Sequence, residues 1–200
     1  MSPRTSVLEA GRTRQRIVDH ALALASVDGL EGVTIGRLAT DLGMSKAGVL
    51  GHFGTKQSLQ LAVVDAAADM FAREVTQRVR GVPPGLAHLE ALCEAWLSYL
   101  ERKLLPGGCF FTAVAAEFDG RGGPVRDAIA GLDSLWRRDL NIHIRRAVNL
   151  GDLPVQTDPD QLVYELVGIM LALNHSLQLH RDEQAPERAR RAVRQRLKAH

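Results

Sequence analysis

The stretch VTIGRLATDLGMSKAGVLGHFGTK, residues 33–56, decides the fold of this chain. Thr34 is a good N-cap, and the apolar residues after it recur at the i, i+3, i+4, i+7 spacing of one helix face. Gly43 supplies the left-handed residue that ends such a helix, and Ser45 can cap a second short helix that runs to about His52. Two short helices therefore meet across a three-residue turn that contains glycine.

This pattern is typical of a helix-turn-helix. Ala39 is small where the two helices cross, and Val49 turns the inner face of the second helix onto the first. A preceding helix over about residues 12–28 can complete a small core. The side chains that we expect to join it there are Leu30, Val33, Met44, Leu50 and Phe53. The spacing alone leaves an ordinary helical hairpin as the alternative.

The residues of this region, in order and spacing, resemble the DNA-binding domain of TetR-family transcriptional regulators. The matching residues are Arg12 to Ile17, Ala21 to Gly29, Val33 to Ile35, Leu38, Ala39, Leu42 to Lys46 and His52 to Lys56. The chain departs from the family pattern at Gly48, Leu50, Gly51 and Ala25. The family usually has a tyrosine where Leu50 stands, so a typical phosphate contact is missing here.

The whole chain has the composition of a helical globular protein. Apolar residues make up 46% of its 200 residues, charged residues 24% and aromatic residues 4%, which favours helices over sheets. We predict an all-α fold of about nine helices, with a helix-turn-helix DNA-binding domain and a basic N-terminal arm in residues 1–54. Residues 55–200 are predicted to form a larger helical domain for effector binding and dimerisation. No stretch reads as a membrane span or a secretory signal, so we expect the cytosol.

If the second short helix lies in the major groove, its first residues face the base edges. Gly48 and Gly51 offer no side chain, so direct readout should be sparse and discrimination should depend on DNA shape and on Lys46. Ala47 could meet a thymine methyl group. The residues predicted to contact DNA are Arg12, Arg14, Thr34, Arg37, Ser45, Lys46, Ala47, Gly48, Gly51, His52 and Lys56. Arg4 and Arg16 could extend the basic arm.

The resemblance implies that helices of the second domain surround an effector pocket. The candidate lining residues are Trp96, Phe110, Phe111, Val114, Phe118, Trp136, Met170 and His175. The alternative is a filled core, because apolar stripes usually just pack. No residue pattern identifies the effector.

The helix that begins after Asp158 carries two apolar stripes, of which the domain core needs only one. We therefore expect a homodimer through a four-helix bundle of the last two helices of each subunit, as is usual in the family. The residues predicted to form this interface are Val163, Val167, Met170, Leu171, Val193 and Leu197. The last helix, rich in arginine, could instead be a surface helix that binds nucleic acid or anionic lipid.

The sequence gives no sign of catalysis. The seven histidines form no ligand-spaced cluster, and Cys93 and Cys109 lack CxxC spacing, so we expect no metal, no cofactor and a packing role for the thiols. The resemblance thus implies a dimeric regulator, most simply a repressor, that binds a palindromic DNA operator and is released by a small-molecule effector. The alternative from another class is an all-α small-molecule binding protein or enzyme whose helix-turn-helix is only structural.

Overall fold

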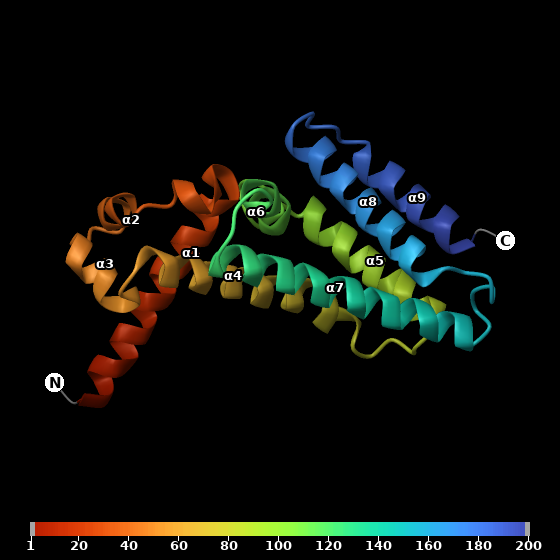
Figure 1. Ribbon diagram of the computed structural model, residues 1–200, viewed down its shortest axis with the longest axis horizontal. Helices are drawn as coiled ribbons and strands as arrows, with labels where there is room; N and C mark the ends of the chain where they lie inside the picture. The colour runs from red at the N-terminus through yellow and green to blue at the C-terminus, as the bar shows by residue number, and fades with distance from the viewer. Residues whose placement is uncertain (1–2, 199–200) are drawn as a thin grey trace. The chain divides into compact units, whose positions relative to one another are not determined.

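The computed structural model describes residues 3–198, with side chains from residue 7 onward, so the side chain of Arg4 lies outside it. The described chain is all-α, with nine α-helices and no strand (Figure 1). Their bounds are α1 Pro3–Gly32, α2 Ile35–Asp41, α3 Lys46–Phe53, α4 Lys56–Phe71, α5 Leu86–Glu101, α6 Phe110–Phe118, α7 Pro124–Asn149, α8 Pro159–Gln178 and α9 Ala185–Lys198. A π-helical turn, Ala72–Thr76, and a 3₁₀ turn, Gln77–Val79, follow α4.

The caps read from the sequence are all in place. Thr34 Oγ1 accepts a hydrogen bond from Arg37 N at 3.1 Å, and Ser45 Oγ accepts one from Gly48 N at 3.0 Å. Gly43 has a φ of 65°, and the amide of the following residue, Met44, donates to the carbonyl of Ala39 at 2.8 Å. This six-to-one bond is the Schellman ending of a helix, and it fixes the turn between α2 and α3.

The first helix is longer than predicted. It begins at Pro3 instead of near residue 12, because a proline fits the first helical position and nothing between it and residue 12 stops a helix. It bends at Gly29, whose φ of 75° and ψ of 166° interrupt the helical geometry, before a final turn that ends at Gly32. The last residues of α1 thus form a separate short turn with its own unsatisfied amide groups.

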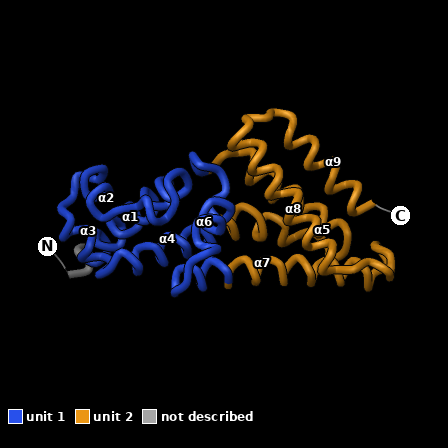
Figure 2. Tube along the Cα trace, turned by 45° about the horizontal axis from the view of Figure 1, so that its top comes forward, with its two compact units in different colours: residues 1–69, 105–130 blue, residues 70–104, 131–200 orange. Residues whose placement is uncertain are grey.

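The chain forms two compact units that interleave along the sequence (Figure 2). Unit 1 holds residues 1–69 and 105–130, and unit 2 holds residues 70–104 and 131–200. Both α4 and α7 cross the division. Unit 1 therefore contains α6 together with α1, α2 and α3, whereas the expected domain boundary lay at residues 54 and 55, which remains a prediction.

Unit 1 is built around the inner faces of α1, α2 and α3. Ile17, Leu38 and Val49 are fully buried there. Against our expectation, Leu50 is 38% exposed, since it shares the outer side of α3 with Ala47 and Gly51. The apolar segment from Cys109 to Ala116 exposes Ala115 and Ala116 on α6, because alanine presents little apolar area to water.

Unit 2 is a helical bundle in which α5, α8 and α9 pack on one another. In Figure 1, α8 and α9 run side by side and are joined by a short connection. The fully buried residues of this core include Leu89, Leu140, Ile144 and Leu166. Within the part of the chain that is described, no helix is both long and apolar enough to cross a lipid bilayer.

Candidate nucleic-acid interface and ligand site

Helix α3 has one buried face and one face open to solvent. Val49 and Phe53 are buried against unit 1, whereas Ala47, Leu50 and Gly51 are exposed on the outer side. Ser45 at the N-cap is also exposed. The end of α3 that the sequence predicts to meet base edges is therefore accessible.

The residues predicted to contact DNA differ in how free they are. Arg12 and Lys46 are exposed, and the Arg14 guanidinium lies 4.9 Å from the centre of the Phe53 ring, a cation–π contact. Arg37 instead pairs with Asp28, with 2.5 Å between Nη1 and Oδ2. Its guanidinium would have to exchange this carboxylate for a phosphate.

Other predicted contacts also have partners within the chain. Lys56 Nζ donates to the carbonyl of Glu31 at 3.0 Å and lies 3.1 Å from its carboxylate. The hydroxyls of Thr34 and Ser45 accept bonds as caps, and each keeps its own hydrogen for another acceptor. His52 packs its ring against Phe53.

A cluster that the sequence did not reveal holds the end of α1. The carboxylate of Glu117 on α6 accepts hydrogen bonds from the backbone amides of Leu30 at 2.7 Å and Glu31 at 2.8 Å. These are the free amides of the short turn after the bend at Gly29. Glu117 therefore caps this turn from 86 residues away in the sequence, a pairing that carries no local signal.

Helix α4 holds the same turn of α1 from its own side. Gln60, which is buried, donates to the carbonyl of Leu30 at 3.3 Å and to the carboxylate of Glu31 at 2.9 Å. Hydrogen bonds from Gln60 and from Lys56 lower the pKa of Glu31 below its usual value. The end of α1 is thus bonded to α4 and α6 at once.

The predicted effector residues are divided between the two units. Phe110, Val114 and Phe118 are buried in unit 1, with Phe111 beside Phe110 in an edge-to-face contact. They belong to the core of unit 1, and their place in an effector pocket stays a prediction. His175 is exposed on α8, with its ring against that of His180.

Trp96 and Trp136, by contrast, lie together in an aromatic cluster of unit 2. Their ring centres are 4.9 Å apart, and Phe71 lies 4.9 Å from Trp136 and 6.0 Å from Trp96, all edge to face. The indole Nε1 of Trp136 is buried without a hydrogen-bond partner. An unsatisfied buried donor beside the π-helical turn that follows Phe71 indicates a place that a ligand's acceptor could fill.

Two histidines stack in the same unit. The rings of His88 and His143 are 4.2 Å apart and 19° from parallel. Burial lowers the pKa of His143, and the carboxylate of Asp139 only partly opposes this. The neutral form of His143 is therefore favoured.

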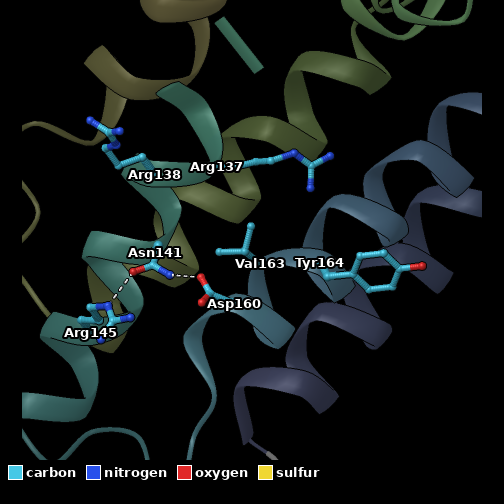
Figure 3. Close-up of a pocket in the computed structure, with 7 residues that line it drawn as sticks. All are labelled: Arg137, Arg138, Asn141, Arg145, Asp160, Val163 and Tyr164. Carbon is cyan, nitrogen blue, oxygen red and sulfur yellow. Dashed lines mark hydrogen bonds between the residues drawn. The ribbon is translucent and has the colours of Figure 1, made fainter. Parts of the chain in front are cut away.

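A cationic groove of about 510 Å³ lies between α7 and α8 (Figure 3). Its lining residues are Arg137, Arg138, Asn141, Arg145, Asp160, Val163 and Tyr164. Figure 3 shows the guanidinium groups spread around the hollow rather than turned toward one point. Asn141 links Arg145, at 2.7 Å, to Asp160, at 2.6 Å. The groove is a broad positive surface, and sequence reasoning did not identify it.

Most residues predicted for the dimer interface are buried within the single chain. Val163, Val167 and Met170 pack inward from α8, and Val193 and Leu197 are covered on α9. They stabilise unit 2 itself. On α8, Val163, Val167 and Met170 all lie on the inner side of the helix. Of the predicted set, Leu171 is exposed, at 47%.

The face of α8 that remains open follows another stripe. Tyr164 is 71% exposed and Leu179 is 67% exposed, and the exposed positions between them are small or apolar except for His175. The exposed residues of this stripe are Tyr164, Gly168, Leu171, Ala172, His175 and Leu179. A Cβ at Gly168 would meet no atom within 4 Å, so a partner helix could approach closely here.

Helix α9 is fixed to α5 through one arginine. The Arg190 guanidinium donates to Glu94 at 2.8 and 3.0 Å and to Glu101 at 2.9 Å, with a further short contact to Glu101. These bonds raise the pKa of Arg190, Glu101 contributing most. The apolar side of α9 is thereby held inside unit 2.

The cysteines have the character of core residues. Cys93 and Cys109 are both buried. Burial raises the pKa of the Cys93 thiol to about 12, which keeps it in the unreactive protonated form. Among the described residues, no three His, Cys, Asp or Glu side chains gather as a metal site.

Comparison with known proteins identifies the family of this chain. Residues 17–63 match the model of the bacterial regulatory proteins of the tetR family, and residues 85–193 match the tetracyclin repressor-like C-terminal domain. The chain belongs to the TetR family. It is a transcriptional regulator, and regulators of this family are typically non-enzymatic DNA-binding proteins.

Several known TetR-family proteins resemble the chain over most of its length. The HTH-type transcriptional regulator SrpR of Pseudomonas putida is 22% identical over 184 residues, which cover 91% of this chain and 83% of SrpR. A TetR regulator from Chloroflexus aurantiacus has a TM-score of 0.85 at 25% identity, covering 94% of this chain and 96% of the other. AibR, solved with isovaleryl coenzyme A and operator DNA, has a TM-score of 0.74 at 19% identity, covering 90% and 95%.

Proposed function

We propose that this chain is a repressor that binds a palindromic operator as a homodimer and releases it when a small molecule binds. The observation that carries the proposal is the exposed N-terminal end of α3 above a buried Val49 and Phe53. Two such helices in adjacent major grooves on one face of DNA would lie about 34 Å apart or a multiple of it. Since its operator would be chromosomal, we place its action in the cytoplasm.

The open stripe of α8 supports the homodimer. Tyr164, Leu171 and Leu179 expose large apolar surface in a row along one helix, and Gly168 lies between the first two. A self-complementary patch of this kind suits a two-fold interface. The last helix fits an anionic membrane poorly, because Ala189, Val193 and Leu197, which would enter the lipid, are buried within the chain.

The aromatic cluster is our candidate for the effector site. Phe71, Trp96 and Trp136 come from three segments of unit 2, and the free Nε1 of Trp136 could donate to an effector. AibR was solved with a coenzyme A thioester, and another related regulator, from Saccharomonospora viridis, with choline. An effector that rearranges this cluster and changes operator affinity five- to 150-fold would need about 1 to 3 kcal/mol of coupling.

Within unit 1, Glu117 is our candidate for transmitting such a change to the helix-turn-helix. It bonds α6 to the last turn of α1, and α4 is bonded to the same turn through Gln60. A shift of α6 would therefore pull on the helix that supports α2 and α3.

A gel-shift titration tests the proposal. The full chain is titrated onto the DNA upstream of its own gene at 50 and 200 mM salt. A regulator that neutralises 6 to 10 phosphates should lose roughly 10³- to 10⁵-fold in affinity between these concentrations. Light scattering on the free protein should give the mass of a dimer. A monomer in solution, or binding that does not change with salt, would refute the proposal.

A further inference from the structure

The exposed face of α3 carries unusually little hydrogen-bonding capacity. Ala47, Leu50 and Gly51 follow one another along its outer side, and none has a polar side-chain atom. Leu50 leaves 38% of its surface in solvent although it has the bulk of a core residue. The remaining surface of Leu50 is covered within the chain.

Gly51 has no role in the fold that requires a glycine. It lies inside α3, its φ is not in the left-handed region, and a Cβ built there meets no atom within 4 Å. Glycine in a helix interior lowers stability relative to alanine. Gly48 differs, because a Cβ there would lie 3.2 Å from the Ser45 Oγ that caps the helix. Gly51 therefore lowers the stability of the monomer, and no feature of the fold requires a glycine there.

The lysine of α3, Lys46, extends toward α2. A Cβ at Gly36 would be 3.3 Å from Cε of Lys46, so the lysine side chain lies along α2. The outer surface beyond it consists of a methyl group, an isobutyl group and bare backbone, from Ala47, Leu50 and Gly51 respectively. In a major groove, the base group that matches such a surface is the C5 methyl of thymine.

We propose that α3 recognises its operator by apolar contact of Ala47 and Leu50 with thymine methyl groups, Gly51 allowing the helix backbone to lie close to the bases. The inference rests on the proposed operator binding and specifies its chemistry. It predicts thymines in each half-site at the positions that α3 covers. It also explains why a residue that exposes apolar surface stands on the outside of the helix.

Replacing thymine by uracil removes only the methyl group, so it tests the contact directly. The full chain selects binding sites from a random duplex pool, and the selected site is then made with deoxyuridine at each half-site thymine in turn. Wild type should lose about fourfold in affinity for each contacted methyl, the factor that corresponds to about 0.8 kcal/mol. The Leu50→Ala protein should bind two duplexes equally well, one with thymine and one with uracil at the position that Leu50 contacts. Equal affinity of wild type for both forms would overturn the inference.

A pair of glycine substitutions tests the close approach. Gly51→Ala should raise the melting temperature by about 1 to 4 °C and yet weaken operator binding, because its Cβ would face the bases. Gly131→Ala is the matched control, since it also lies inside a helix, α7, with no atom within 4 Å of an added Cβ. It should raise the melting temperature and leave DNA affinity unchanged.

The outcomes separate this inference from the function beneath it. Failure to enrich any DNA would overturn the operator binding itself and the readout with it. Salt-dependent binding to an enriched site without methyl dependence would leave the regulator and overturn only the inference. A Gly51→Ala protein that binds as tightly as wild type would overturn the role given to Gly51.

Discussion

Replacing Glu117 by alanine should destabilise unit 1 through the loss of one cap. Its carboxylate accepts two amide hydrogen bonds at 2.7 and 2.8 Å, from Leu30 and Glu31. A hydrogen bond to a charged group contributes about 1.5 to 3 kcal/mol, but water can replace the acceptor at the exposed amide of Glu31. The free energy of unfolding should therefore fall by the contribution of one such bond, about 2 kcal/mol, which is close to the strongest N-cap effects.

For a chain of this size, that loss lowers the melting temperature by about 4 to 8 °C. Melting is followed by circular dichroism at one fixed protein concentration, because dimerisation makes the midpoint depend on concentration. Asp119→Ala is the control, since Asp119 is exposed near the same end of α6 with the same charge, and it should change stability by less than about 0.5 kcal/mol.

Hydrogen exchange gives a local readout of the same substitution. The amides of Leu30 and Glu31 should exchange faster in Glu117→Ala, and Glu117→Gln, which keeps one carbonyl acceptor, should lie between it and wild type. The capping role would be refuted by a Glu117→Ala protein that melts at the same temperature as wild type and keeps both amides protected from exchange.

Three further substitutions have outcomes fixed by the geometry. Arg190→Ala should lower the free energy of unfolding by about 1 to 3 kcal/mol in urea denaturation, because it leaves two neighbouring glutamates of α5 without their donor. Glu74, whose pKa is lowered mainly by its hydrogen bond with Arg102, stabilises the fold above the unfolded pKa of about 4.5. The stability difference between wild type and Glu74→Gln should thus shrink as pH falls below 4.5, and a constant difference would contradict the assignment. Gly107→Ala would place a Cβ 1.7 Å from the carbonyl oxygen of Ser26, so it should cost several kcal/mol and show as a low melting temperature.

The helix-turn-helix was predictable because its signals are local. Thr34 and Ser45 bond to amides three residues ahead, and the turn closes between Ala39 and Met44. Such contacts join residues that are close in the sequence, so residue type and spacing suffice to predict them. The resemblance to one family was readable for the same reason.

The sequence could not show which apolar residues would face inward. The outward turn of Leu50 on α3 and the burial of Val193 on α9 both went against the prediction. On a helix that is apolar on more than one side, the inward face is chosen by the helices that pack against it. The open stripe from Tyr164 to Leu179 on α8 follows from the positions of α5 and α9.

The sequence by itself determined the all-α class, the caps and turn of the DNA-binding motif, and the family. Only the tertiary structure decided the contacts between residues far apart in the chain. Glu117 reaches the end of α1, Arg190 joins α9 to α5, and Trp136 meets Phe71 and Trp96. These pairings depend on where whole helices pack, and no local rule of spacing or residue type encodes that.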